Sequence, residues 1–297
     1  MIRGMYSAVS GLRTHQTMID VTSNNLANVN TVGYKGARTT FKDQLQQTIY
    51  GGTAGGPNTG GTNAAQVGLG VQLGSIDTVM NPGSLAATGG TLDVAIQGEG
   101  WFRVGAAGST PPAPSAGDPA PTAYATVSFQ NMQYTRAGNF TRNSEGYLVT
   151  PDGQYLVGQP TTMGTPAETS GSYIFLPKTA SQVSIGTDGV VSYIDTNGVR
   201  ASAGTLSLAK FPNTEGMMRI SSNKWQPSPA AGDPAIGTPG DPTVGLGVTI
   251  GGTLEMSNID LAQEFTQMIV GQRGFQANSR VISVADQMME ELVNLKR

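Results

Sequence analysis

Apolar residues recur at every seventh position near both ends of the chain, and a spacing of seven keeps an apolar stripe on one side of an α-helix. Such a stripe needs a second helix to cover it, so we predict that the two ends form helices that associate. We name the ten residues the heptad seam and expect them to carry self-assembly. They are Met5, Leu12, Ile19, Leu26, Leu254, Leu261, Met268, Phe275, Ile282 and Met289.

The ends of these two helices can also be predicted. An asparagine cluster at residues 24–30 has poor helix propensity and should stop the first helix before Gly33. Asn258 or Asp260 could cap the start of the last helix. The alternative use of both helices is to fold back on the middle of the chain as part of its core.

Between the two ends the apolar period changes from seven to two, which is typical of β-strands. The pattern is clear in residues 91–104, TLDVAIQGEGWFRV, and it returns over 134–157 and 183–194. Asp188-Gly189 and Asn197-Gly198 separate alternating runs and are strong hairpin signals. We therefore predict an α+β fold in which the terminal helices pair in a coiled-coil-like inner domain and the central part of the chain forms an all-β body of short antiparallel hairpins.

These patterns divide the chain into three regions. The linker region contains residues 51–66, which are almost entirely Gly, Thr, Asn and Ala and are expected to form an extended or mobile connector. The predicted regions are a helical domain of residues 1–30 plus 254–297, an extended Gly-rich linker over 31–80, and a β-rich domain over 81–253 with loops inserted near 105–122 and 226–242.

Composition excludes several classes of protein. Charged residues make up 12% of the 297 residues, which is about half the usual share, and the net charge of −3 gives no reason to expect nucleic acid as a partner. The chain has no cysteine, so disulfides and thiolate metal sites are absent. The basic N-terminal stretch lacks the apolar run of a cleaved signal peptide, and no segment reads as a membrane span.

The residues that could support catalysis are few. His15 is the single histidine and is interpreted as a surface or packing residue of the first helix. Asp152 and Asp188 are expected in hairpin turns. We therefore expect no catalytic residue, no metal site and no cofactor, and no enzymatic activity. Asn139 begins a glycosylation sequon by pattern, and its modification is left open.

Four ordered segments resemble the rod and hook proteins of the bacterial flagellum. Residues 91–104 and 134–153 resemble the central β-domain of that family, and residues 264–297 resemble its C-terminal helix. The N-terminal signature of the family is carried here by Asn24, Asn25, Leu26, Ala27 and Asn28, followed by Thr31, Gly33, Tyr34 and Lys35.

Within this family, residues 46–78 and the C-terminal ending are most similar to the short type of hook protein. We therefore place the hook protein first and keep the distal rod protein, a drive-shaft subunit of similar plan and length, as the alternative. A secreted adhesin with a β-body and coiled-coil ends is a more remote possibility.

The resemblance implies a homopolymer that grows as an open helical filament, in which the terminal helices form an inner tube. As a hook, this tube would be a universal joint that transmits motor torque to the filament. The implied partners are neighbouring rod and hook–filament junction proteins, the hook cap and the export apparatus. The implied location is extracellular, in the hook or basal body, after export without a cleaved signal peptide.

Overall fold

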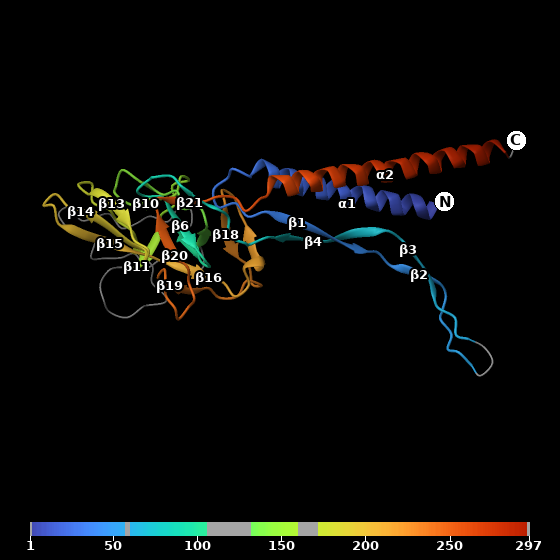
Figure 1. Ribbon diagram of the computed structural model, residues 1–297, viewed down its shortest axis with the longest axis horizontal. Coiled ribbons are helices and arrows are strands. Elements are labelled where there is room, and N and C mark those ends of the chain that lie inside the picture. Colours follow the sequence, from blue (N-terminus) through green and yellow to red (C-terminus); the bar gives the residue numbers. More distant parts are fainter. Residues whose placement is uncertain (1, 57–59, 106–131, 160–171, 296–297) are drawn as a thin grey trace. The chain divides into compact units, whose positions relative to one another are not determined.

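The computed structural model describes residues 2–56, 60–105, 132–159 and 172–295 (Figure 1). Its internal contacts divide the chain into two units. The helical unit consists of Met1–Asn28, Gly36–Val79 and Ile259–Arg297, and the β-body consists of Val29–Lys35 and Met80–Asn258. The chain therefore passes between the units after residues 28, 35, 79 and 258, and these boundaries differ from the predicted ones.

Two helices form one part of the helical unit. They are α1, Ile2–Ala27, and α2, Leu261–Asn294, and they lie side by side (Figure 1). The Asp260 side chain accepts hydrogen bonds from the backbone N–H groups of Ala262 and Gln263. Of the two caps predicted for the last helix, Asn258 and Asp260, the structure uses Asp260, which satisfies two donors that an uncapped helix would leave without partners.

An antiparallel two-stranded ribbon forms the other part of the helical unit. Strand β1, Ala37–Asp43, pairs with β4, Val71–Thr78, and β2, Gln46–Tyr50, pairs with β3, Ala65–Gly68. The hydroxyls of Thr53 and Thr62 continue the pairing at 2.7 Å. Of the two forms predicted for 51–66, extended or mobile, the described part is extended: the hydrogen bonds across the ribbon continue into the Gly-rich segment, where the Thr53–Thr62 pair supports them.

The β-body contains two larger sheets, both antiparallel throughout. One has the strand order β17-β18-β8-β7-β16-β19, and the other has the order β12-β11-β15-β14-β13. Two-stranded pairs β20-β6, β21-β5 and β10-β9 accompany them. The strands are β5 Leu85–Ala87, β6 Val94–Gln97, β7 Trp101–Val104, β8 Gln133–Thr135, β9 Thr141–Arg142, β10 Leu148–Val149, β11 Val157–Gln159, β12 Ser172–Tyr173, β13 Ser181–Ile185, β14 Val190–Ile194, β15 Arg200–Leu206, β16 Leu208–Lys210, β17 Met217–Arg219, β18 Lys224–Pro227, β19 Ala235–Gly237, β20 Val248–Gly251 and β21 Thr253–Glu255.

The predicted α+β class is confirmed, and so are two of its hairpins. Asp188-Gly189 joins β13 to β14, and Asn197-Gly198 joins β14 to β15, with Gly189 and Gly198 at positive φ. The loop predicted near 226–242 is wrong in part, because β19 lies inside it and pairs with β16 as an edge strand. Prolines near an edge strand remove no ladder hydrogen bond, so they do not prevent this pairing. The loop predicted near 105–122 lies, from residue 106 on, outside the described residues.

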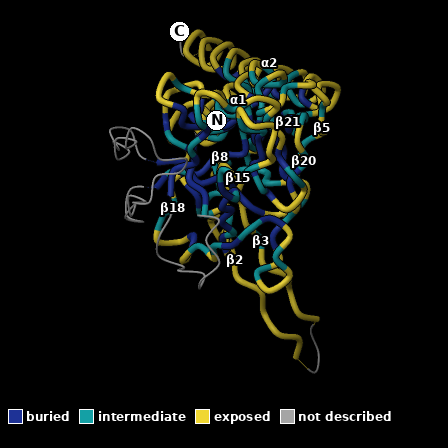
Figure 2. The backbone as a smooth tube through the Cα atoms, turned by 90° about the vertical axis from the view of Figure 1, so that its left-hand side faces the viewer, coloured by how far each residue is buried: buried dark blue, intermediate teal, exposed yellow. Residues whose placement is uncertain are grey.

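The core of the β-body consists of two apolar clusters. In one cluster, Phe102 and Phe140 meet edge to face at 5.2 Å, and in the other Trp101 and Trp225 meet at 5.6 Å. All four side chains are buried. The buried segments of the chain are dark blue in Figure 2, which also shows α2 exposed along much of its length.

Candidate assembly surface and motif residues

Small and polar residues make the closest contact between α1 and α2. The buried residues of α2 are Glu264, Gly271 and Ala285, and Asn278 lies half-buried on the same line. These four positions are also spaced by seven. Small residues on this line let the backbones of α1 and α2 approach closely. Because the line contains no large apolar side chain, the apolar pattern of the sequence does not reveal it.

Glycines set the distance between the two helices. A Cβ atom on Gly274 would lie 2.5 Å from the ring of His15, and one on Gly11 would lie 2.6 Å from Nδ2 of Asn278. Each glycine therefore receives a side chain of the opposite helix. His15 also meets the edge of Phe41 on β1 at 6.0 Å, which agrees with its interpretation as a packing residue.

The heptad seam is divided by the structure into three sets. Leu254 lies on β21 and is buried there, so the series on α2 begins at Leu261. Six members are half-buried: Met5, Leu12, Ile19, Leu26, Met268 and Ile282. Three members stay exposed, namely Leu261 at 45%, Phe275 at 39% and Met289 at 39%.

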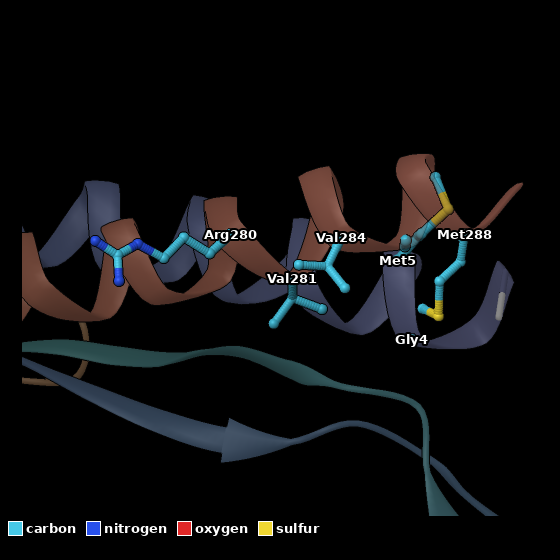
Figure 3. Close-up of a pocket in the computed structure, with 7 residues that line it drawn as sticks. Gly4, Met5, Arg280, Val281, Val284 and Met288 are labelled. Carbon is cyan, nitrogen blue, oxygen red and sulfur yellow. The ribbon is translucent and has the colours of Figure 1, made fainter. Parts of the chain in front are cut away.

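Further apolar side chains of α2 are exposed beside these three. A groove of about 390 Å³ lies between the helices, where Val281, Val284 and Met288 of α2 face Gly4 and Met5 of α1 (Figure 3). Its lining is almost entirely apolar. The other large apolar residues of α2 that are exposed are Phe265, Ile269, Val270, Leu292 and Val293. Large apolar side chains exposed in this number are typical of a binding region.

Asn25 of the family motif joins three elements of the helical unit. Its side chain pairs with both backbone groups of Ala37, accepting from N at 3.0 Å and donating to O at 2.7 Å. It also donates to Oε1 of Glu264 at 3.2 Å. Burial raises the pKa of Glu264, and the hydrogen bond from Asn25 opposes that shift. An amide is the side chain that can give and accept here at once.

The second half of the motif lies in the β-body. Gly33 adopts φ +66°, and a Cβ there would lie 2.6 Å from the backbone N of Ala137. Tyr34 is buried under the guanidinium of Arg219, 4.5 Å from its ring centre. Lys35 is buried and its Nζ lies 2.5 Å from Oε1 of Glu255, a partner that sequence reasoning missed.

The other motif residues occupy the end of α1. Asn28 donates from Nδ2 to the backbone O of Asn24, which closes the last turn. Leu26 is half-buried, and Ala27 is exposed at the final position of the helix. The hydrogen bond from Asn28 to Asn24 therefore helps to end α1 at a defined place.

The described residues contain no group of three or more His, Cys, Asp or Glu side chains suited to a metal ion. Asp152 and Asp188 lie in turns as predicted, and Asp152 pairs with Nζ of Lys224 at 2.8 Å.

Asn139, the first residue of the sequon, is half-buried beside β6, where its backbone forms an isolated β-bridge with Asp93. Within the described part of the chain, no helix has the length and apolarity needed to span a membrane.

Comparison with known proteins shows the family of this chain. Three family descriptions match: "Flagella basal body rod protein" over residues 5–35, "Flagellar hook protein FlgE/F/G D1 domain" over 125–193, and "Flagellar basal body rod FlgEFG protein C-terminal" over 250–295. The flagellar basal-body rod protein FlgG of Bacillus subtilis is 43% identical over 298 aligned positions, which cover all of both chains. The chain belongs to the flagellar rod and hook protein family.

Two further relatives allow the rod and hook branches of this family to be compared. The flagellar basal-body rod protein FlgG of Agrobacterium fabrum is 34% identical, with 97% of each chain covered. The flagellar hook protein FlgE of Borreliella burgdorferi is 28% identical over 443 aligned positions that cover both chains. The rod relatives are therefore more similar than this hook relative, which favours the alternative that the sequence analysis placed second.

Proposed function

We propose that this chain is a structural subunit of the flagellar rod, of the distal rod type, and that it polymerises into a segment of the drive shaft. The single observation that carries the proposal is the full-length identity of 43% to a basal-body rod protein, in contrast to 28% for a hook protein. The hook function given first in the sequence analysis becomes the second candidate.

The surface of the helical unit supports polymerisation. Phe265, Ile269 and Val293 of α2 are all more than half exposed, at 51%, 56% and 69%. In the ribbon, Leu45 is 82% exposed and Ile49 is 63% exposed. Covering such side chains contributes about 25 cal/mol per Å² of apolar area, so neighbouring copies would stabilise one another.

The geometry also favours an open assembly over a closed dimer. The apolar surface of α2 and the ribbon are different in sequence and in secondary structure, so one copy can offer two unlike surfaces. Unlike surfaces that bind head to tail produce a helical filament when the rotation does not close. The proposed partners are further copies, the adjoining rod and hook subunits and the export apparatus, and the proposed site is the basal body outside the cell membrane.

Gene deletion followed by electron microscopy of purified basal bodies distinguishes the two candidates. A truncated rod is expected if the chain is a distal rod subunit. A complete rod that lacks a hook would contradict the proposal and support the hook function.

A polymerisation assay tests the assembly surface itself. Phe275→Asp places a charge on the exposed face of α2 and should abolish filament formation by the purified protein, measured by light scattering and microscopy. Val199→Asp is the matched control, because Val199 is also an exposed apolar residue, at 62%, but lies between β14 and β15 of the β-body. Filaments of normal length from Phe275→Asp would exclude this face as an interface.

A further inference from the structure

Three of the four chain crossings lie close in sequence to one buried ionic cluster of the β-body. Lys35 is the last residue before the crossing that follows residue 35, and Asn81 is the second residue after the crossing at 79. Glu255 precedes the crossing at 258 by three residues. The cluster contains all three positions, and Glu255 is at its centre.

Glu255 uses all its oxygen atoms. Its Oε1 accepts from Nζ of Lys35 at 2.5 Å and from the backbone N of Gly83 at 3.0 Å. Its Oε2 accepts from Nη1 of Arg136 at 3.1 Å, and its main-chain O accepts from N of Gly33 at 2.8 Å. The side chains of Lys35 and Glu255 are fully buried, and that of Arg136 is 6% exposed.

A second layer of hydrogen bonds extends the same connections. Nζ of Lys35 also donates to the backbone O of Asn81 at 2.9 Å, and Nδ2 of Asn258 donates to that oxygen at 3.0 Å. The backbone O of Lys35 accepts from the guanidinium of Arg219, which lies over the ring of Trp225 at 4.9 Å. The segments before residue 36, after residue 79 and before residue 259 are therefore tied to one another.

Close backbone packing leaves no room for this arrangement to shift. A Cβ on Gly83 would lie 2.0 Å from the main-chain O of Met256. Gly33 is pressed in the same way against the backbone of residues 136 and 137. Both glycines belong to segments that Glu255 holds by hydrogen bonds, so the backbone contacts and the ionic contacts fix the same register.

We propose that Glu255, Lys35 and Arg136 form a clamp that fixes three of the four connecting segments to the β-body, so that force on the connections reaches the body without local slippage. The mechanical role rests on the proposed function, because a rod subunit works under torque. The existence of the clamp does not depend on that function.

Electrostatics favour a positioning role over a stabilising one. Burial lowers the pKa of Lys35 and of Arg136, and Glu255 opposes both shifts. Two cations share one carboxylate, so their desolvation is incompletely compensated. Buried ionic groups of this kind are often replaceable by apolar residues without loss of stability, whereas removal of one partner leaves an unpaired charge. Hydrogen bonds to a fixed carboxylate are directional, so they hold the connecting segments in a single register, whereas apolar packing alone does not.

Amide hydrogen exchange of the full-length monomer tests the clamp. Glu255→Gln should raise the exchange rate of the Gly33 and Gly83 amides by about a hundredfold, since it leaves two buried cations without their counter-ion. The core amides of Leu148 and Leu206 should change far less. Lys210→Gln is the matched control, because it breaks a partly exposed ion pair of the same body, in which Nζ of Lys210 lies 2.6 Å from Oε2 of Glu99, and it should leave Gly33 and Gly83 unchanged.

A second variant separates positioning from stability. The triple change Lys35→Met, Arg136→Met and Glu255→Leu removes every charge of the clamp at similar side-chain volume. The proposal expects tryptophan-monitored unfolding near that of the parent, with exchange at Gly33 still at least tenfold faster. Gly33 is the decisive reporter because its acceptor is the main-chain O of residue 255, which every variant retains.

Each outcome bears on a separate claim. Equal rises at Gly33 and at the core amides in Glu255→Gln, or parent-like protection of Gly33 in the triple variant, would overturn the clamp. Failure of the parent protein to form filaments would overturn the proposed function and leave the exchange result valid. If both hold, filaments of the triple variant should bend more easily than those of Lys210→Gln, as measured by their persistence length in electron micrographs.

Discussion

The β-body and the helical unit place their apolar residues in opposite ways. In the β-body, Phe102, Leu148 and Leu206 have no exposed surface. In α2, three residues of 34 are buried, and none of these three is a large apolar side chain. One unit buries its apolar residues within a single chain, while the other leaves many of them exposed. The proposed rod subunit would use both properties, because the first keeps its form before assembly and the second supplies the apolar area that assembly would cover.

The largest expected effect contrasts two phenylalanines. Phe102→Ala should lower the free energy of unfolding of the β-body by about 3–5 kcal/mol, because it opens a cavity at a fully buried site. Phe275→Ala should change the stability of the monomer by no more than about 1 kcal/mol, since that ring is 39% exposed.

Urea denaturation measures both effects, with tryptophan fluorescence reporting the β-body, where Trp101 and Trp225 lie, and far-UV circular dichroism reporting the helices. A loss at Phe275 as large as that at Phe102 would mean that the helical unit has a closed core of its own.

A smaller effect contrasts two glycines of the helical unit. Gly4 has no atom near its would-be Cβ, so Gly4→Ala should stabilise α1 by about 1 kcal/mol through helix propensity. Gly274→Ala should lose that gain and more, by about 1–3 kcal/mol, because the methyl group would meet the ring of His15. The melting of the helical signal measures both variants. Equal stabilisation at both sites would show that the helices do not rely on close contact at Gly274.

The smallest effect is a difference in the response to acid. The pKa of Asp152 is lowered by its hydrogen bond from Lys224, so this group adds stability above the ordinary aspartate range near 3.8 and loses it as the pH falls further. The pKa of Glu264 is raised by burial, so its contribution is present below about 4.5 and is lost as the pH rises through the raised value. Acidification should therefore weaken the β-body and favour the helical unit.

The two spectroscopic signals test this at several pH values, with Asp152→Asn and Glu264→Gln as the variants in which the respective pH dependence should shrink. Parallel loss of both signals, unaffected by either variant, would contradict the assignment of these two carboxyl groups.

Much of the local structure follows from the sequence alone. The period of seven predicts both helices, the period of two predicts the strands, and Asp-Gly and Asn-Gly predict the hairpins, because each signal depends on neighbours within a few residues. Asp260 is predictable as a cap for the same reason. The family motif identifies Asn25 and Lys35 as important, although it does not say what they contact.

Only the tertiary structure shows the contacts between residues that lie far apart in the sequence. The close line of α2 consists of Glu264, Gly271, Asn278 and Ala285, because near contact between two backbones selects small residues, and small residues carry no apolar signal. The partner of Lys35 is Glu255, 220 positions away, and burial makes that pairing necessary. The Gly-rich segment became a ribbon because strand pairing across it supplies hydrogen bonds that composition cannot reveal.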